Sequence, residues 1–347
     1  MFTPQQTEEF YQALINRDKT YEGVFFAGIT STGIFCRPSC TARKPKAKNC
    51  LFYKTAQDAL LAGFRPCKRC QPLLKPFEPS DMVKHLIKLV EQEPERRWSD
   101  KDVRKLGFCP STVRRQFKKR YDMTFSAFSR ARRMGIALKT IREGDKIIHA
   151  QIDAGYSSAS GFRDAFSSIM GAPPNIKNHL AFQAEWIDTP LGSMIAIVDE
   201  THLHLLEFTD RRGLEKEIEK MRNSLKVAIL PGRTAVTEAI EQELGSYFNG
   251  ELKNFSTPIK LHGSDFQKSV WNELLSIPYG ETRSYAEQAQ ALKNPKAIRA
   301  VASANGKNQL AIIIPCHRVI GSDGKLTGYA GGLPRKEWLL NMERDNS

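Results

Sequence analysis

Hydrophobic and polar residues follow different periods in three successive stretches of the chain. The first stretch, to about residue 75, contains the short strand-like runs VFFAGIT, STGIFC and LFY and ends in the proline-rich segment CQPLLKPFEPS. Residues 81 to about 180 have a helical pattern and end in GAPPNIKNH. The remainder opens with the alternating, β-branched runs SMIAIVD and HLHLLEF and turns helical after about residue 265.

This pattern predicts a multidomain α+β protein. We place a small α/β module at residues 1–76, with a helix over about 55–62, and an all-α domain at 81–180. The last domain has a β-sheet half at 181–263 and a helical half at 264–347. A chain of 347 residues is long enough for two or three domains that each bury a core.

Four of the seven cysteines lie in the first module with the spacing of a metal site. Cys36 and Cys40 form a Cys-x3-Cys pair, and Cys67 and Cys70 form a Cys-x2-Cys pair further along. Few large apolar residues lie between the pairs, so one bound Zn²⁺ would hold the module together. The simplest alternative is a zinc ribbon whose sulfurs do no chemistry. Cys50 and Cys109 are expected to be ordinary thiols.

The middle domain contains two candidate helix-turn-helix units. DKDVRKLG, GFCPS and STVRRQFKKRY form the first, and DKIIHAQIDAG, YSSA and SGFRDAFSSIMG form the second, joined by the long helix FSAFSRARRMGIALKTIREG. The turn glycines Gly107 and Gly155 are separated by the same interval as Arg115 and Arg163. The second helix of the first unit is strongly basic, with Arg114, Arg115, Lys118, Lys119 and Arg120. We interpret these cations as major-groove contacts, with a merely solvated helix face as the alternative.

The charge balance points to a polyanion as partner. Lysine and arginine exceed aspartate and glutamate by 14, and the isoelectric point is about 9.4. No run approaches the roughly 18 to 20 apolar residues of a membrane span, and the N-terminus lacks the pattern of a signal peptide. An odd number of cysteines then favours reduced thiols. We therefore expect a cytoplasmic protein that binds double-stranded DNA, has no membrane partner and is a monomer.

The helical half of the last domain carries a second candidate thiol site. IPYGETRSYAEQAQAL places Tyr285 at a helix start, and a further helix, PKAIRAVASANG, follows. The apolar run LAIIIP then leads directly into Cys316, His317 and Arg318. A histidine near a cysteine favours a nucleophilic thiolate. Side chains adjacent in sequence rarely hydrogen-bond well, so coincidence remains an alternative on this pattern alone.

Taken together, these motifs resemble the Ada family, adaptive-response proteins that repair alkylated DNA and activate transcription in bacteria. The resemblance rests on FCRPSC, AGFRPCKRCQP, PCHRVIG and YAGGLPRKEWLLNME and covers almost the whole chain. The middle domain resembles the paired helix-turn-helix module of the AraC family. The last domain is similar to the O6-alkylguanine-DNA alkyltransferases, which enter the minor groove and flip the damaged base out of the duplex.

For the last domain, the resemblance implies specific residue roles. Cys316 would accept the O6-alkyl group, His317 would act through a water as its base, and Glu343 would orient that histidine. Tyr285 would donate a proton toward N3 of the leaving guanine, and Arg299 would fill the gap left by the flipped base. Asn308 matches the hinge asparagine before the active-site strand, although Gln309 stands where the family usually has proline.

For the first two domains, the resemblance implies a damage-dependent switch. Cys36 would accept a methyl group from a phosphotriester, with Cys40, Cys67 and Cys70 as its fellow zinc ligands. Four thiolates on a dication carry a net charge of −2, which methylation reduces to −1, so repulsion from DNA phosphates would fall. Residues of the basic loop and of the two helix-turn-helix units would contact DNA: Arg43, Lys44, Arg114, Arg115, Lys118 and Arg163. The loop reads TARK where the family often has a version ending in histidine.

The expected function is therefore suicidal repair of alkylated DNA by a single-turnover methylated-DNA–[protein]-cysteine S-methyltransferase. Methyl groups would pass irreversibly from O6-methylguanine and O4-methylthymine to Cys316 and from methylphosphotriesters to Cys36. Methylated Cys36 would turn the protein into a transcriptional activator, with RNA polymerase as a further partner and the nucleoid as its location when DNA-bound. Two alternatives remain open on the sequence: a zinc-dependent transcription factor without methyl transfer, and a cysteine hydrolase acting through Cys316 and His317.

Overall fold

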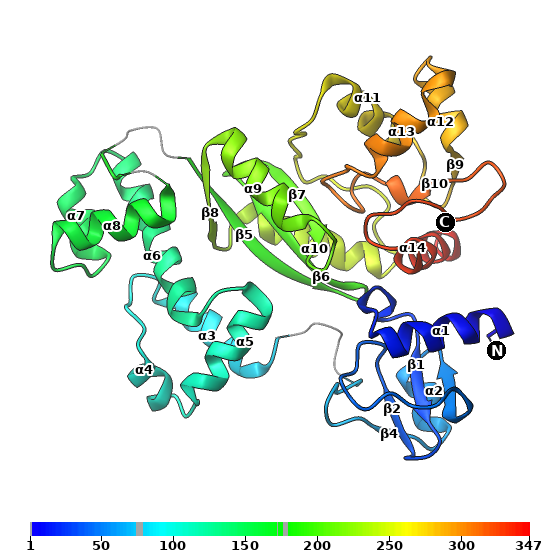
Figure 1. Ribbon diagram of the computed structural model, residues 1–347. Coiled ribbons are helices and arrows are strands. Elements are labelled where there is room, and N and C mark those ends of the chain that lie inside the picture. Colours follow the sequence, from blue (N-terminus) through cyan, green and yellow to red (C-terminus); the bar gives the residue numbers. More distant parts are fainter. Residues whose placement is uncertain (1, 74–78, 172, 176–179) are drawn as a thin grey trace.

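The first domain is a four-stranded sheet with two helices packed against it (Figure 1). The computed structural model describes residues 2–73, 79–171, 173–175 and 180–347. The strands β1 (Phe26–Ile29), β2 (Ile34–Cys36), β3 (Cys50–Tyr53) and β4 (Arg65–Pro66) have the order β3-β1-β2-β4. Helix α1 (Pro4–Asn16) stacks Phe10 on Phe25 at 4.5 Å, and α2 (Ala56–Leu61) confirms the helix expected near residue 55. Because β2 and β4 are parallel neighbours, the Cys36 and Cys67 segments are brought side by side.

The described residues of the middle domain form six helices and confirm both helix-turn-helix units. Helices α4 (Asp100–Lys105) and α5 (Pro110–Tyr121) form the first unit, and α7 (Ile147–Asp153) and α8 (Ala159–Met170) form the second. Helix α3 (Asp81–Gln92) packs on the first unit, and the long helix α6 (Phe125–Arg142) joins the two. Gly107 and Gly155 have φ values of 81° and 73°, a left-handed conformation that glycine adopts without strain.

The last domain opens with an antiparallel meander that a parallel strand extends. Strands β5 (Leu180–Thr189), β6 (Gly192–Val198), β7 (Leu203–Phe208) and β8 (Val227–Pro231) have the order β7-β6-β5-β8. Helix α9 (Leu214–Leu225) connects β7 to β8, and α10 (Ala235–Phe248) follows. Every residue of β6 and β7 is buried, so this sheet has no face open to water along those strands.

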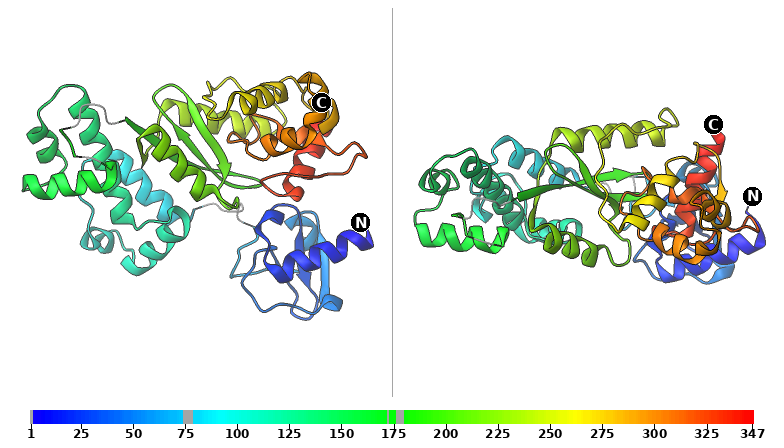
Figure 2. Two further views of the ribbon diagram at one scale, coloured as in Figure 1. Left: turned by 45° about the horizontal axis from the view of Figure 1, so that its top comes forward. Right: turned by 90° about the horizontal axis from the view of Figure 1, so that it is seen from above.

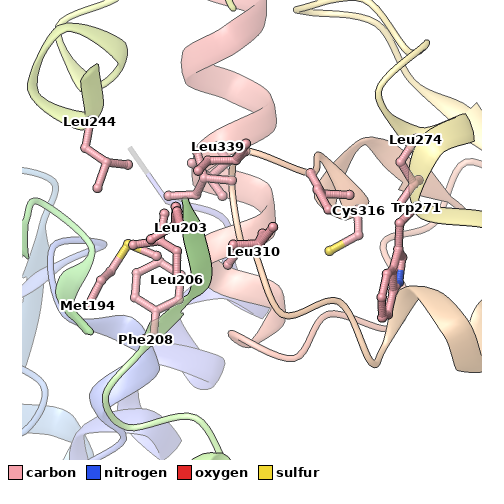
Figure 3. Packing of buried hydrophobic residues seen from close by; sticks show 14 of the residues in the cluster. Met194, Leu203, Leu206, Phe208, Leu244, Trp271, Leu274, Leu310, Cys316 and Leu339 are labelled. Carbon is pink, nitrogen blue, oxygen red and sulfur yellow. The ribbon is translucent and has the colours of Figure 1, made fainter. Parts of the chain in front are cut away.

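The helical half packs against the β7 side of the sheet (Figure 1). It contains α11 (Asp265–Leu274), α12 (Tyr285–Ala291), α13 (Ile298–Asn305) and α14 (Leu333–Asp345), with the short parallel strands β9 (Arg283–Ser284) and β10 (Val319–Ile320). One hydrophobic core joins both halves, from Met194 and Leu206 on the strands to Trp271 and Leu339 on the helices (Figure 3). No helix in the described ranges is both long and apolar enough to cross a membrane.

The helix-turn-helix domain is packed onto the last domain rather than only linked to it. Met134 and Leu138 of α6 share a buried cluster with Ala228 and Leu230 of β8. Beside this cluster, Tyr121 contacts the Trp186 ring edge-on at 4.7 Å between centroids. The views in Figure 2 show α6 and α8 next to the β8 edge.

One of the basic residues that we interpreted as major-groove contacts has a different role. Arg120, at the end of α5, donates two parallel hydrogen bonds to the Asp188 carboxylate of β5, at 3.0 and 2.9 Å. Its side chain is only 12% exposed. The prediction of a DNA contact at Arg120 is therefore wrong, because the guanidinium is committed to the interface between domains.

The first domain also contacts the last one. The 3-10 turn η1 (Lys19–Tyr21) lies against α14, where a Cβ at Gly332 would come within 3.0 Å of the Thr20 side chain (Figure 2). Gly23 is equally close-packed, since its added Cβ would lie 2.6 Å from the Pro190 carbonyl oxygen. The first domain thus contacts the last domain at two places, the start of α14 and the turn between β5 and β6.

Replacing Asp188 with asparagine should lower the free energy of unfolding of the full chain by about 1.5–3 kcal/mol, the usual worth of a hydrogen bond to a charged group. Arg120 would remain enclosed without its counter-charge. Urea denaturation followed by circular dichroism measures the change. Glu200→Gln, which breaks the exposed Arg142–Glu200 pair, is the matched control and should cost less than about 1 kcal/mol. Equal losses in the two variants would contradict the prediction.

Candidate functional site

The Cys316 thiol lies in a turn that β7 holds in place. The Leu206 N–H donates to the Gln309 carbonyl at 2.9 Å, and the Ala311 N–H donates back to the Leu206 carbonyl at 2.8 Å. The chain then turns through Ile312, at φ 74°, and enters the 3-10 turn η4 (Cys316–Arg318). Cys316 itself is buried in the same cluster as Leu310 and Trp271 (Figure 3). Backbone pairing with β7 therefore holds Gln309, the residue that stands where the family usually has proline.

Asn308 ties this turn together and contacts the sulfur directly. Its Nδ2 donates to the Ile314 carbonyl at 2.8 Å and to Cys316 Sγ at 3.3 Å, while its Oδ1 accepts from the Leu310 N–H at 3.0 Å. Burial raises the pKa of the Cys316 thiol to about 11, and the Asn308 hydrogen bond opposes part of that rise. A buried thiol of this kind needs a base before it can react as a thiolate.

A buried carboxylate organises the residues beside the thiol. Glu343 of α14 accepts from His317 Nε2 at 2.8 Å and from the Tyr247 hydroxyl at 2.6 Å. Arg318 donates to both carboxylate oxygens, from Nε at 2.8 Å and from Nη2 at 3.0 Å. Burial alone would raise the pKa of Glu343, but the hydrogen bonds and charges of His317 and Arg318 outweigh it and hold that pKa well below its usual range.

The imidazole of His317 is fully buried and points only one nitrogen at Glu343. Burial lowers the pKa of His317, and the hydrogen bond to Glu343 offsets part of this effect. Its other nitrogen, Nδ1, has no hydrogen-bond partner among the described residues. A neutral imidazole with one oriented and one open nitrogen has the arrangement of a general base.

Tyr285 and a buried lysine meet on one backbone carbonyl. The Tyr285 hydroxyl donates to the Thr327 carbonyl at 3.2 Å, and Lys336 Nζ donates to the same oxygen at 2.6 Å. Lys336 also donates to the Val319 carbonyl at 2.5 Å, next to η4. Burial raises the pKa of Tyr285 and lowers that of Lys336 to about 8, while the charge of a Cys316 thiolate would favour the ammonium form.

The sequence analysis did not identify three residues of this site as functional: Arg318, Lys336 and Tyr247. Arg318 and Lys336 lie inside the motifs PCHR and RKEW, so their position beside predicted site residues could have indicated a role in the site. Tyr247 lies almost a hundred positions from Glu343, and no local pattern marks it. Arg299, by contrast, is an exposed residue of α13.

The four cysteines of the first domain come together as the spacing predicts. Their sulfur atoms all lie within 4.8 Å of one another, and the Cys40 and Cys67 sulfurs are 3.9 Å apart. Ligands at about 2.3 Å on a tetrahedral zinc ion are about 3.8 Å apart, so the set fits Zn²⁺. Hydrogen bonding to Cys40 and Cys70, together with burial, raises the pKa of the Cys36 thiol far above its usual range. A dication reverses this, because it favours the thiolate form of its ligands.

A buried ion pair between Arg37 and Glu22 lies beside the cysteine cluster. Arg37 donates to Glu22 at 3.3 Å and, through its backbone N–H, to Cys70 Sγ at 3.4 Å. Glu22 also accepts from the Ser39 N–H at 3.2 Å. These contacts fix the Cys36–Cys40 loop against the Cys70 turn, so the cluster has a supporting layer of hydrogen bonds.

Apart from Arg120, the side chains predicted to contact DNA are exposed. Arg114 pairs with Asp100 at 3.4 Å and Lys118 with Asp122 at 2.8 Å, both on the surface of the first helix-turn-helix unit. Exposed pairs of this kind are worth little, so phosphates can replace the carboxylates. The exposed residues are Arg43, Lys44, Arg114, Arg115, Lys118 and Arg163.

Four family models match the chain, one after another. Residues 9–72 match the metal binding domain of Ada, and residues 103–176 match a helix-turn-helix domain. Residues 184–261 match the ribonuclease-like domain of 6-O-methylguanine DNA methyltransferase, and residues 265–345 match its DNA binding domain. The models therefore follow the order expected from the sequence.

Individual relatives agree with these matches. The chain is 34% identical to the bifunctional transcriptional activator/DNA repair enzyme Ada of Escherichia coli, over 98% of this chain and 97% of that protein. It is 46% identical to a methylated-DNA–protein-cysteine methyltransferase of Methanosarcina barkeri, over 46% of this chain and 96% of that protein. Among solved structures, Mycobacterium tuberculosis OGT in complex with DNA is 40% identical, with a TM-score of 0.41, and covers 48% of this chain and 95% of that one.

Replacing Glu343 with glutamine should lower the free energy of unfolding by about 3–5 kcal/mol at pH 7, because a buried Arg318 loses its counter-charge. The pKa of Glu343 is lower in the folded than in the unfolded state, so its contribution is present above the unfolded value of about 4.3 and is lost as the pH falls below it. The difference between variant and wild type should therefore shrink below about pH 4.

Urea denaturation over a series of pH values measures this dependence. Glu337→Gln, an exposed position on the same helix, is the control and should stay close to the wild type throughout. A Glu343→Gln difference that is constant down to about pH 2 would mean that the carboxylate is not ion-paired in solution.

Proposed function

The chain belongs to the Ada family, and on that premise we propose that it repairs alkylated DNA by accepting methyl groups on two cysteines, Cys316 and Cys36. The observation that carries the proposal is the 34% identity to the E. coli protein along 98% of this chain, which includes both cysteine-bearing domains. Methyl groups on O6 of guanine and O4 of thymine go to Cys316, and those on backbone phosphotriesters go to Cys36.

At Cys316 the geometry supports nucleophilic displacement. His317 takes the thiol proton through a water, and its Nε2 contact with Glu343 stabilises the imidazolium that forms. The thiolate attacks the methyl carbon, the S–C bond forms as the C–O6 bond breaks, and the electron pair passes to the guanine. The Tyr285 hydroxyl gives its proton to N3 of that leaving group. A thioether does not hydrolyse readily, so each protein molecule reacts once at this site.

Base extrusion precedes this chemistry. Cys316 is buried, so a base within a stacked duplex cannot reach it and has to leave the helix. Arg299, exposed on α13, then occupies the space that the base vacates. Asn308 holds the turn that presents the sulfur, which makes it a positioning residue for the same reaction.

At Cys36 the acceptor is one of four sulfurs around a bound zinc ion. Cys36, Cys40, Cys67 and Cys70 would hold the Zn²⁺ ion, which would favour the thiolate form of these sulfurs. Cys36 Sγ forms a bond to the methyl carbon while the phosphotriester C–O bond breaks, which leaves an ordinary phosphodiester. The exposed Arg43 and Lys44 contact the neighbouring phosphates.

Methylation of Cys36 also controls promoter binding in this proposal. The cluster loses one unit of negative charge, so its repulsion from nearby DNA phosphates falls. The helix-turn-helix units, through Arg114, Arg115, Lys118 and Arg163, then read the promoter, and the bound protein recruits RNA polymerase. We place the protein in the cytoplasm, on the nucleoid when DNA-bound, as a monomer. A transcription factor without methyl transfer is not favoured, because it leaves the Cys316–His317–Glu343 arrangement without a use.

Cys316→Ala should abolish methyl transfer from O6-methylguanine in duplex DNA and leave transfer from methylphosphotriesters intact. The two sulfurs lie in separate domains, so loss of one acceptor leaves the other in place. Intact-protein mass spectrometry counts the methyl groups gained on each substrate, and Cys109→Ala, an exposed thiol outside both sites, is the control. A folded Cys316→Ala protein that lost both transfers would contradict the proposal, and released product without a mass gain would favour hydrolysis.

Reaction of Cys36 with a methylphosphotriester should raise the affinity of the same protein for a promoter duplex by about 1–3 kcal/mol, the usual size of coupling between two sites. The gain should be larger at low salt, because screening weakens the interaction of the cluster with phosphates. Titration of one duplex before and after methylation, at two salt concentrations, measures it. Equal affinities in both states would leave the first domain as a repair module only.

A further inference from the structure

Helix α13 is held rigidly from behind. The Trp271 Nε1–H of α11 donates to the Ala304 carbonyl at 2.9 Å. The Asn305 side chain donates to Gln288 of α12 at 2.7 Å, and all of these groups are buried. With Val301 packed in the same core, the helix cannot shift without breaking buried hydrogen bonds. Whatever its outer face carries is therefore presented in a fixed position.

Beyond its first turn, the outer face of α13 is made of short side chains. Ala300, Ser303 and Gly306 are exposed along it, so no long side chain stands between the helix backbone and a bound partner. This allows close approach to the floor of a narrow groove. The long side chains on this face stand at its first turn, where Arg299 follows Ile298.

Ile298 is 41% exposed at the start of this helix. A single exposed apolar residue is ordinary on a protein surface, but the neighbours of this one are Lys296 and Arg299, both exposed cations. An apolar protein partner would have to desolvate those charges. A nucleic acid offers both chemistries at once, with phosphates for the cations and the faces and sugar edges of bases for the isoleucine.

The Ile298 side chain is also stiff enough to insert between bases at a low cost in conformational entropy. Isoleucine is branched at Cβ and stiff at χ1, so it loses less conformational entropy when fixed than arginine does. Minor-groove proteins commonly insert such apolar side chains between base steps and thereby unstack them. An arginine alone fills a gap but exposes a charged group to the stacked bases.

We propose that Ile298 is a wedge residue that acts beside Arg299. When α13 enters the minor groove, the Ile298 side chain inserts against the base step next to the extruded guanine and keeps the stack from closing. This inference rests on the proposed function, since it concerns the step that delivers the base to Cys316. It assigns to Ile298 a part in base extrusion and none in the displacement itself.

The test compares single-turnover methyl transfer by full-length wild type and Ile298→Ala on three substrates: O6-methylguanine paired in a duplex, in a single strand, and as the free base. The variant should react about tenfold more slowly with the duplex, equivalent to about 1.4 kcal/mol. Its rates with the single strand and the free base should match the wild type, because neither has a stack to hold open. Ile298→Met, which keeps an apolar side chain of similar volume, should retain most of the duplex rate.

Leu275→Ala, with a side chain that is 47% exposed at the end of α11, is the matched control for loss of an exposed apolar residue and should leave all three rates unchanged. Equal slowing of Ile298→Ala on duplex and single strand would show a plain binding contact and overturn the wedge. A duplex rate equal to that of the wild type would also overturn it. If the wild type itself transferred no methyl group to Cys316 from any of the three substrates, the proposed function would fail instead.

Discussion

The Glu343 carboxylate is the group on which the thiol site depends. It lies fully buried, and three elements supply its four partners: Tyr247 from α10, His317 and Arg318 from η4, and the Gly280 N–H from the loop before β9. A buried charge is tolerated only when its hydrogen bonds are made, so any one of these elements that moved would leave the carboxylate unsatisfied. The same contacts that hold the domain together therefore also set the tautomer and direction of the imidazole.

The thiolate form is disfavoured for different electrostatic reasons at the two cysteine sites. At Cys316 burial opposes the thiolate, and the protein supplies an Asn308 hydrogen bond and the nearby Lys336 ammonium, with His317 next to it in the chain. In the first domain four sulfurs within 4.8 Å of one another repel as anions, and only a cation among them allows all four to ionise. The first site is thus surrounded by side chains that favour the thiolate, while the second has four cysteines placed to hold a metal ion.

Much of this arrangement was predictable from the sequence, for reasons that differ from site to site. The four clustered cysteines and the glycine turns at Gly107 and Gly155 are short-range patterns with a single physical cause, and the structure reproduces them. The prediction for Arg120 was wrong because a basic helix face does not indicate that Asp188, 68 positions away, forms an ion pair with one of its cations. Lys336 was passed over for a similar reason: a lysine in a polar tail looks solvated until the carbonyls of Val319 and Thr327 enclose it.

The packing of α6 and α8 on β8 has a consequence for the sheet itself. In the order β7-β6-β5-β8, strand β8 is an outer strand, and such strands tend to recruit other chains through their unpaired backbone groups and apolar side chains. Here the helix-turn-helix domain covers Ala228 and Leu230 and so shields that edge from self-association. Removing the helix-turn-helix domain from this chain would uncover that strand, so in this fold the fusion of the two domains and the resistance to self-association are linked through a single strand.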